Sequence, residues 1–272
     1  MIKKAWLLIL VALCAPTLAA PKAELWAYWQ AQDAASQSTV AHNIWGNFLQ
    51  KYLVHQDGIA LLDYAAIADV DKQALDDYLA LLAETKPRTL NRAEQRAYWI
   101  NLYNALTVHT VLQHYPIDSI RDISSGLFSF GPWDDKLITV EDKALSLNDI
   151  EHRILRPIWQ DARLHYAVNC ASIGCPNLVL SAYTAANSEE MLDAAAAAYI
   201  NHPRGVRLQN GRLYVSSIYE WFKEDFGGDD LSVIAHLQHY AEPKLQEQLG
   251  KISAISGDDY NWALNDTRDG ER

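Results

Sequence analysis

The chain has 272 residues and a net charge of −11, and half of its residues are hydrophobic. This length supports one large domain or two tightly joined domains. The acidic balance, without any basic stripe, excludes nucleic acid and anionic membrane as expected partners. Nine Trp and fourteen Tyr suit sugar-stacking surfaces or a heavily aromatic core, and core burial is the commoner cause.

Residues 1–19 have the pattern of a secretory signal peptide. Lys3 and Lys4 form a basic region, an apolar run follows over residues 5–14, and small residues lead to a cleavage site after Ala19. The apolar run is too short to span a bilayer. We therefore predict an exported, soluble protein, periplasmic or secreted, with no membrane span.

The elements of the first half are predominantly helical. Residues 20–42 are rich in Ala and Gln and predict a linker or a loose helix, and residues 43–250 are expected to form a single domain. The spacing of apolar residues predicts helices over 40–52, 71–84 and 91–115, the last opened by the capping pair Asn91 and Glu94 and ended by Pro116. An extended segment over 59–64, a strand over 136–140 and a helix over 148–155 complete this half.

The second half mixes strands with helices. We predict a strand over 164–169, a helix over 187–200, and a hairpin whose arms, 206–208 and 213–215, flank the turn pair Asn210-Gly211. Helices are expected over 219–226, 231–240 and 243–249, and residues 251–272 are expected to be a polar, frayed tail. This order predicts an α+β fold, with a helical N-terminal half packed on a small antiparallel sheet.

Two amides interrupt the apolar face of the helix predicted over 91–115. At 100° per residue, Asn101 and Asn104 share a face with apolar residues such as Ala97 and Val108. A buried amide must be hydrogen-bonded. Either both side chains tie down neighbouring loops, or one donates a hydrogen bond to a developing oxyanion. His109 lies at the edge of this face and is expected to border the same cavity.

Glu151 and His152 open the helix predicted over 148–155. Glu151 has the spacing of a capping-box acid with Asn148. His152 then projects from the first turn, where the helix dipole disfavours its protonated form. A neutral imidazole is what a general base requires, so His152 is a candidate base, and Glu151 a candidate to orient an imidazole.

Cys170 and Cys175 are the only cysteines outside the leader. In an oxidising compartment, neighbouring thiols tend to pair, and a five-residue separation permits a bridge. Cys170 is therefore either half of a structural disulfide or a nucleophile at the end of an extended run. His165 can serve it as a base only if the chain folds back, because an extended run would separate the two by roughly 16 Å; otherwise the base is His109 or His152.

Metal and cofactor motifs are weak. His236 and His239 are spaced to share a helix face, but such pairs are common and no cluster has zinc spacing. There is no phosphate-binding loop, dinucleotide fingerprint or serine-hydrolase elbow. We therefore predict no cofactor and no metal.

Four ordered blocks resemble the domain-of-unknown-function family numbered 547, which includes exported bacterial proteins and plant proteins. The blocks are Ala97–Ala105, Leu147–Leu155, His165–Cys170 with Cys175-Pro176, and Val215–Phe226. The resemblance covers roughly residues 44–227 and supports a single domain that links the Asn-bearing helix, Glu151-His152 and Cys170.

The resemblance also bears on the cysteines. Plant members keep a cysteine at the position of Cys170 and often have serine at that of Cys175, which weakens the prediction of an obligatory disulfide. The resemblance also suggests a relationship between this family and papain- or transglutaminase-like thiol enzymes. In those enzymes the catalytic cysteine comes before the catalytic histidine and asparagine along the chain. This chain lacks that order, so a related core would be rearranged, with the base upstream of the thiol.

Two functions follow as expectations. The first is a thiol-dependent acyl-transfer enzyme (a peptidase, amidase or peptide transferase) that acts on a peptide or small molecule. Its nucleophile is Cys170, its base is His165, His109 or His152, its oxyanion donor is Asn101 or Asn104, and Glu151 orients the imidazole. The alternative is a non-catalytic exported binding module with a Cys170–Cys175 disulfide.

Overall fold

The computed structural model describes residues 21–123 and 131–268. Among these residues it forms a mixed α+β fold with eight α-helices and small sheets of two and three strands. The predicted signal peptide lies outside the described residues. The expected fold class is therefore confirmed at the level of α+β, but the largest of these sheets mixes antiparallel and parallel pairing.

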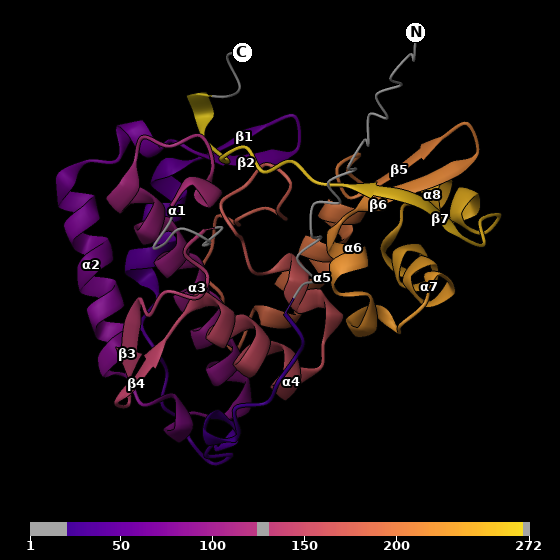
Figure 1. The fold of residues 1–272 in the computed structure, drawn as a ribbon. Helices are drawn as coiled ribbons and strands as arrows, with labels where there is room; N and C mark the ends of the chain where they lie inside the picture. The colour runs from indigo at the N-terminus through magenta and orange to yellow at the C-terminus, as the bar shows by residue number, and fades with distance from the viewer. Residues whose placement is uncertain (1–20, 124–130, 269–272) are drawn as a thin grey trace, which may run out of the picture.

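The first lobe is mainly helical and is drawn in indigo to magenta in Figure 1. It contains two hairpins, each an antiparallel pair of strands. Its elements are α1 (Asn43–Tyr52), β1 (Leu53–Gln56), β2 (Ile59–Leu62), α2 (Asp69–Glu84), α3 (Arg92–His114), β3 (Ile138–Val140) and β4 (Lys143–Leu145).

Helix α3 is the centre of this lobe. Asn91 caps it by accepting a hydrogen bond from the backbone N–H of Glu94, as the sequence predicted. Aromatic and aliphatic side chains on several faces of α3, including Tyr98, Trp99 and Leu102, are buried. A helix buried on all sides needs neighbours on all sides, which explains why the other elements of the lobe surround it in Figure 1.

The second lobe contains most of the C-terminal half and has its own cluster of buried apolar residues. Between the lobes lie a π-helix (Asp149–Leu155), α4 (Arg156–Trp159) and a 3-10 helix (Ala162–Tyr166). The second lobe comprises α5 (Ser188–Ile200), β5 (Val206–Gln209), β6 (Arg212–Ser216), α6 (Ile218–Trp221), α7 (Asp230–Tyr240), α8 (Pro243–Leu249) and β7 (Ile255–Asp259).

The hairpin of β5 and β6 is confirmed. Val206 pairs with Val215, and both turn residues, Asn210 and Gly211, have positive φ (52° and 72°). This is the backbone that a type I′ turn requires.

Three local expectations differ from the structure. The strand predicted over 164–169 is a 3-10 helix up to Tyr166, because a short apolar run does not by itself distinguish a strand from a buried helical turn. The capping box predicted at Asn148 lies two residues earlier, where Ser146 and Asp149 exchange hydrogen bonds. The segment expected as a linker packs against the body, with Trp29 fully buried.

The C-terminal segment also differs from the expected frayed tail. Strand β7 lies parallel to β6, and the chain then crosses from the second lobe to the first, where Leu62 forms a bridge with Asp266. Figure 1 shows this yellow strap running between the two lobes. Leu264, Asn265 and Asp266 are about 1% exposed, so this segment is part of the packed structure.

Candidate functional site

The loop from Cys170 to Cys175 lies where the two buried clusters meet. Tyr166 belongs to the cluster of the second lobe, whereas Ala167, Val168 and Ala171 belong to that of the first. Cys170 and Cys175 form a disulfide with a Cα–Cα distance of 6.2 Å, inside the range usual for such bridges. Of the two states expected for these cysteines, the structure therefore contains the bonded one.

The two sulfurs have different surroundings. Cys175 is 4% exposed, whereas Cys170 is partly exposed. The buried sulfur of Cys175 accepts a hydrogen bond from the backbone N–H of Cys170 (2.8 Å) and another from the hydroxyl of Tyr260 (3.2 Å). The Sγ of Cys170 lies 3.1 Å from the Tyr260 hydroxyl and 3.4 Å from the Ser172 hydroxyl. The outer sulfur is thus bordered by hydroxyl groups and by solvent.

Tyr260 is the side chain that joins this site to the rest of the second lobe. Burial raises the pKa of its hydroxyl far above the ordinary value and outweighs the lowering effects of the hydrogen bond from Ser172 and the charge of Arg204. At neutral pH the hydroxyl therefore stays protonated and acts as a hydrogen-bond donor. Its ring packs against both Trp221 and Trp262, with centroid distances of 4.8 and 4.7 Å, and these two tryptophans also contact each other at 5.7 Å.

Hydrogen bonds to helix α3 fix the approach to the loop. The side chain of Asn104 donates to the carbonyl of Ala167 and accepts from the backbone N–H of Asn169, both at 2.8 Å. Asn169 in turn donates to Pro176 O and accepts from the backbone N–H of Ala171. Asn104 therefore ties down the chain that leads into Cys170, which is the first of its two predicted roles.

Asn101 holds a different segment. It donates to the carbonyl of Tyr183 (2.7 Å) and accepts from the backbone N–H of the same residue (3.0 Å). Asn101 and Asn104 thus each bond backbone groups of another segment, and none of these hydrogen bonds is made to Cys170.

The backbone directly after Cys170 is unusual. Ala171 has a φ of +57° and is completely buried. A left-handed conformation at a residue other than glycine costs about 1–2 kcal/mol and persists only where its surroundings enforce it. The hydrogen bond to the Asn169 side chain provides part of that constraint. Such conformations concentrate at functional sites.

Two of the three predicted histidine bases, His165 and His152, lie in a separate buried cluster. Nε2 of His165 is 2.7 Å from Asp225, which also accepts a hydrogen bond from Arg156 at 2.6 Å. Arg156 lies 2.9 Å from Nδ1 of His152. Oε1 of Glu151 is 3.9 Å from Nδ1 of both histidines. The structure thus brings His165, His152 and Glu151 together around Asp225 and Arg156.

The charges in this cluster are tightly coupled. Burial lowers the pKa of His152, so the neutral imidazole predicted for it is favoured. Burial alone would raise the pKa of Asp225, but hydrogen bonds from His165 and Arg156 outweigh it and hold that pKa well below its usual range. The cluster therefore contains a permanent carboxylate beside His165.

His109 lies outside both groups. Its Nε2 is 2.9 Å from Asp76 and 3.1 Å from the amide of Gln113. Within the described ranges 21–123 and 131–268, the sulfur of Cys170 has two side-chain hydrogen-bonding neighbours, Ser172 and Tyr260, and neither is a histidine. Among the described residues, no histidine therefore forms a hydrogen bond with the sulfur of Cys170.

Arg204 places a positive charge next to the cysteine loop at Ile173. Its guanidinium donates to the carbonyl of Ile173 and to the side chain of Asn177, and it lies over the ring of Tyr199. Burial lowers the pKa of Arg204. In the part of the chain that the structure describes, its hydrogen-bond partners are neutral, so its charge acts on the loop without a bonded counter-ion.

The C-terminal segment completes the site. The backbone N–H groups of Ile173 and Gly174 donate to Ala263 O and Asn261 O, both at 2.8 Å. The pairing continues at Ser172, which forms a bridge with Leu264. The cysteine loop is therefore held from one side by α3 and from the other by residues 260–264.

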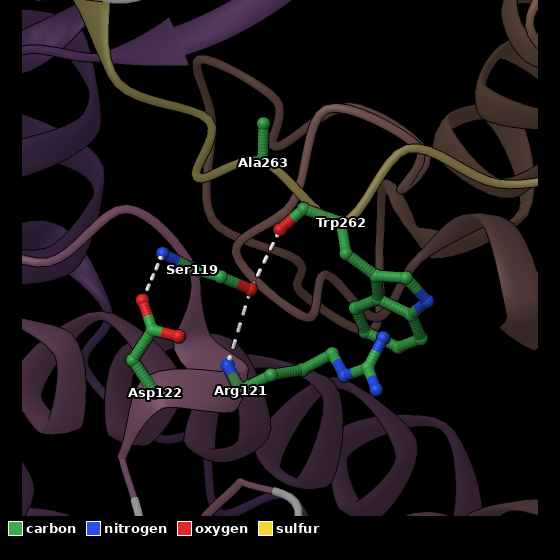
Figure 2. A pocket seen from close by; sticks show the side chains of 5 residues that line it. All are labelled: Ser119, Arg121, Asp122, Trp262 and Ala263. Carbon is green, nitrogen blue, oxygen red and sulfur yellow. Dashed lines mark hydrogen bonds between the residues drawn. The ribbon is translucent and has the colours of Figure 1, made fainter.

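A pocket of about 440 Å³ opens beside this segment, lined by Ser119, Arg121, Asp122, Trp262 and Ala263. Figure 2 shows the Ser119 hydroxyl donating to Trp262 O while it accepts from the backbone of Arg121. The Arg121 guanidinium lies 5.3 Å from the Trp262 ring centroid. The pocket thus offers one cation and one aromatic wall.

His236 contacts a buried tyrosine, because its Nε2 is 2.9 Å from the Tyr166 hydroxyl. Among the residues that the structure describes, no three His, Cys, Asp or Glu side chains are arranged to hold a metal ion. None of the described helices is both long and apolar enough to cross a membrane.

Comparison with known proteins identifies the central part of the chain. Residues 87–200 match the model of a family described as "Protein of unknown function, DUF547". The matched range includes α3, Glu151, His152, His165 and the cysteine loop, and ends with α5. No curated protein matches the chain, and no solved structure matches it.

Several residues of the site were not predicted from the sequence. Tyr260 and Arg204 contact the cysteine loop, Ser172 lies within it, and Asp225 and Arg156 contact His165 and His152. One signal was present, because Tyr260, Trp262 and Leu264 alternate as the inward residues of a strand do. Nothing local points to Asp225 or Arg204, since each acts across a long separation in sequence.

Proposed function

We propose that the chain is an exported, thiol-dependent acyl-transfer enzyme (a peptidase, amidase or peptide transferase) whose nucleophile is Cys170. The Cys170–Cys175 bond is then the oxidised form, which must be reduced before Cys170 can attack a carbonyl carbon. The nucleophile of such an enzyme is the thiolate.

The observation that carries this proposal is the difference between the two sulfurs. Cys170 reaches solvent, whereas Cys175 is buried and its sulfur accepts two hydrogen bonds. A bridge that only fastens the fold has no need of an accessible sulfur. The enforced left-handed backbone at Ala171 and the position of Cys170 between two lobes add support. The same position is compatible with a rearranged papain- or transglutaminase-like core.

The surroundings suit a thiolate nucleophile. The Tyr260 hydroxyl, kept protonated by burial, is placed to donate to the sulfur or to a developing oxyanion, and Arg204 supplies positive charge beneath the loop. Asn104 acts as a positioning residue for the chain before Cys170. Proton transfer is assigned to His165 with Glu151, whose Oε1 lies 3.9 Å from Nδ1 of His165.

The test is alkylation of the reduced protein. After mild reduction of the folded chain from residue 20 onward, iodoacetamide at pH 6 should label Cys170 about tenfold faster than an ordinary thiol, as a pKa lowered by one unit implies. The variant Cys175→Ser should keep this labelling, and the matched variant Cys170→Ser should abolish it. If Cys170 in the folded Cys175→Ser variant is not labelled at pH 6, the proposal is wrong.

A second candidate is a non-catalytic exported binding module with a structural disulfide. The observation that favours it is that Asn101, Asn104, His165 and His152 all have protein partners, as residues of a stabilising polar network would. The same pair of variants separates the candidates. A structural bridge predicts equal losses of melting temperature for Cys170→Ser and Cys175→Ser, together with no labelling at pH 6.

A further inference from the structure

The disulfide presents one sulfur to a reagent and hides the other. A thiolate must approach along the S–S axis to displace the far sulfur, and only Cys170 is partly exposed, since Cys175 is 4% exposed. Attack from solvent is therefore directed to Cys170, and Cys175 is the leaving group. In thiol–disulfide exchange, the reaction is faster when the leaving sulfur is the better-stabilised thiolate.

The structure stabilises a thiolate at Cys175. Its sulfur already accepts hydrogen bonds from the backbone N–H of Cys170 and from the Tyr260 hydroxyl. Hydrogen bonds to the charged form favour that form. Arg204 donates to Ile173 and Asn177, the residues on either side of the Gly174–Pro176 segment, and its partners in the described chain are neutral. Two donors thus contact the departing sulfur, and one cation binds the chain on either side of the Gly174–Pro176 segment.

The surface next to Cys170 indicates the kind of thiol that fits. Trp221 and Trp262, both partly exposed, flank Tyr260, whose hydroxyl contacts the Cys170 sulfur. Aromatic rings bind apolar side chains and peptide groups well. The net charge of −11 opposes small anionic thiols. These features favour a cysteine within a peptide that carries apolar neighbours.

We propose that the chain is also a thiol–disulfide exchanger, with reduced cysteine peptides as its substrate class. A peptide thiolate attacks Sγ of Cys170, forming a peptide–Cys170 disulfide while the Cys170–Cys175 bond breaks and Cys175 leaves as a thiolate. A second peptide thiolate attacks the peptide sulfur of that mixed disulfide and releases Cys170. In total, two peptide thiols are oxidised to one disulfide, and the protein takes up two electrons and two protons.

This activity differs from acyl transfer in what it requires. Acyl transfer needs Cys170 alone, whereas exchange needs both sulfurs. In the reverse direction, Cys170 of the reduced protein attacks a peptide disulfide, and Cys175 then resolves the mixed disulfide. Without Cys175 the reaction must stop at the mixed disulfide.

The experiment follows the sulfurs by mass. The folded, oxidised protein is incubated with a reduced synthetic peptide that has one cysteine between two phenylalanines, and thiols are then blocked with N-ethylmaleimide. We expect peptide disulfide, a protein with two blocked thiols, and any mixed disulfide on Cys170 in about tenfold or greater excess over Cys175, because only the sulfur of Cys170 is open to attack from solvent. Reduced glutathione, as an anionic control thiol, should react more slowly.

The variant Cys175→Ser is then given the oxidised peptide dimer. It should accumulate a stable peptide–Cys170 disulfide, whereas the reduced native protein should release both peptides as thiols. A native bond that stays intact in the folded protein, or a peptide attached mainly to Cys175, would overturn the inference. If that bond is inert but Cys170 of Cys175→Ser is still alkylated at pH 6, exchange fails while the acyl-transfer proposal stands.

Discussion

Asp225 shows how one side chain can determine the electrostatics of a buried cluster. It accepts hydrogen bonds from Arg156 and lies within hydrogen-bonding distance of His165, and these contacts hold the pKa of its carboxyl well below the ordinary value of 3.8. A carboxylate with a lowered pKa stabilises the folded state at every pH above the ordinary value. That contribution is lost as the pH falls below it.

The corresponding prediction compares Asp225→Asn with the native chain. Removing the charge leaves Arg156 without its carboxylate, so the free energy of unfolding at pH 7 should fall by about 2 kcal/mol. Because the native carboxylate is itself protonated in strong acid, the difference should shrink below pH ~4. Urea unfolding at several pH values measures both. Glu84→Gln, at an exposed site at the end of α2, is the control and should change little. A pH-independent difference would contradict this account.

At the residue scale, the sequence predicted the type of role but not the partner. The helical projection correctly placed Asn101 and Asn104 on a buried face, and burial correctly required hydrogen bonds for both. Their partners, Tyr183 in one case and Ala167 with Asn169 in the other, come from segments more than sixty residues away along the chain. Periodicity contains no information about which distant backbone a side chain will meet.

Among the elements, the C-terminal segment has the largest influence on the site. Residues 260–264 pair with the cysteine loop and supply Tyr260. Gly174 makes this close approach possible, because a Cβ built there would lie 2.9 Å from both the backbone nitrogen and the backbone oxygen of Asn261. Backbone atoms cannot move aside as the end of a flexible side chain can.

We therefore expect Gly174→Ala to push the C-terminal segment away from the loop. The free energy of unfolding should fall by about 1–3 kcal/mol, the usual range for overpacking, and hydrogen exchange at the backbone amides of Ile173 and Gly174 should accelerate. The matched control is Gly46→Ala in α1, where the nearest atom to a new Cβ is at an ordinary 3.8 Å and a helical alanine is favourable. Equal effects of the two substitutions would show that Gly174 is not a contact point.

Helices and strands with strong local sequence signals were predicted correctly, and those without such signals were not. Helix α3 has a capping residue, a long apolar pattern and a terminating proline, and the hairpin of β5 and β6 has an Asn-Gly turn, so both were predicted correctly. Strand β7 contains Ser256-Gly-Asp-Asp259, a sequence with little intrinsic strand preference. Its conformation comes from pairing with β6, which local reasoning does not detect.

At the scale of the whole molecule, two lobes meet at the cysteine loop and one strap joins them. Each lobe has its own buried cluster, and the α+β class of the fold followed from the order of helices and strands. The arrangement around the loop did not, because the loop is contacted by α3, by Arg204 and by the C-terminal segment, which are brought together only by folding. The central claim is that this arrangement makes Cys170 the reactive sulfur.

The most direct measurement of that claim is the thiol pKa of Cys170 in the folded Cys175→Ser variant, followed by the ultraviolet absorbance of the thiolate as pH is raised. Arg204 and the protonated Tyr260 hydroxyl should lower this pKa at least one unit below the ordinary value of about 8.5. A value at or above 8.5 in a variant that remains folded would contradict the claim and leave the disulfide as a structural bridge.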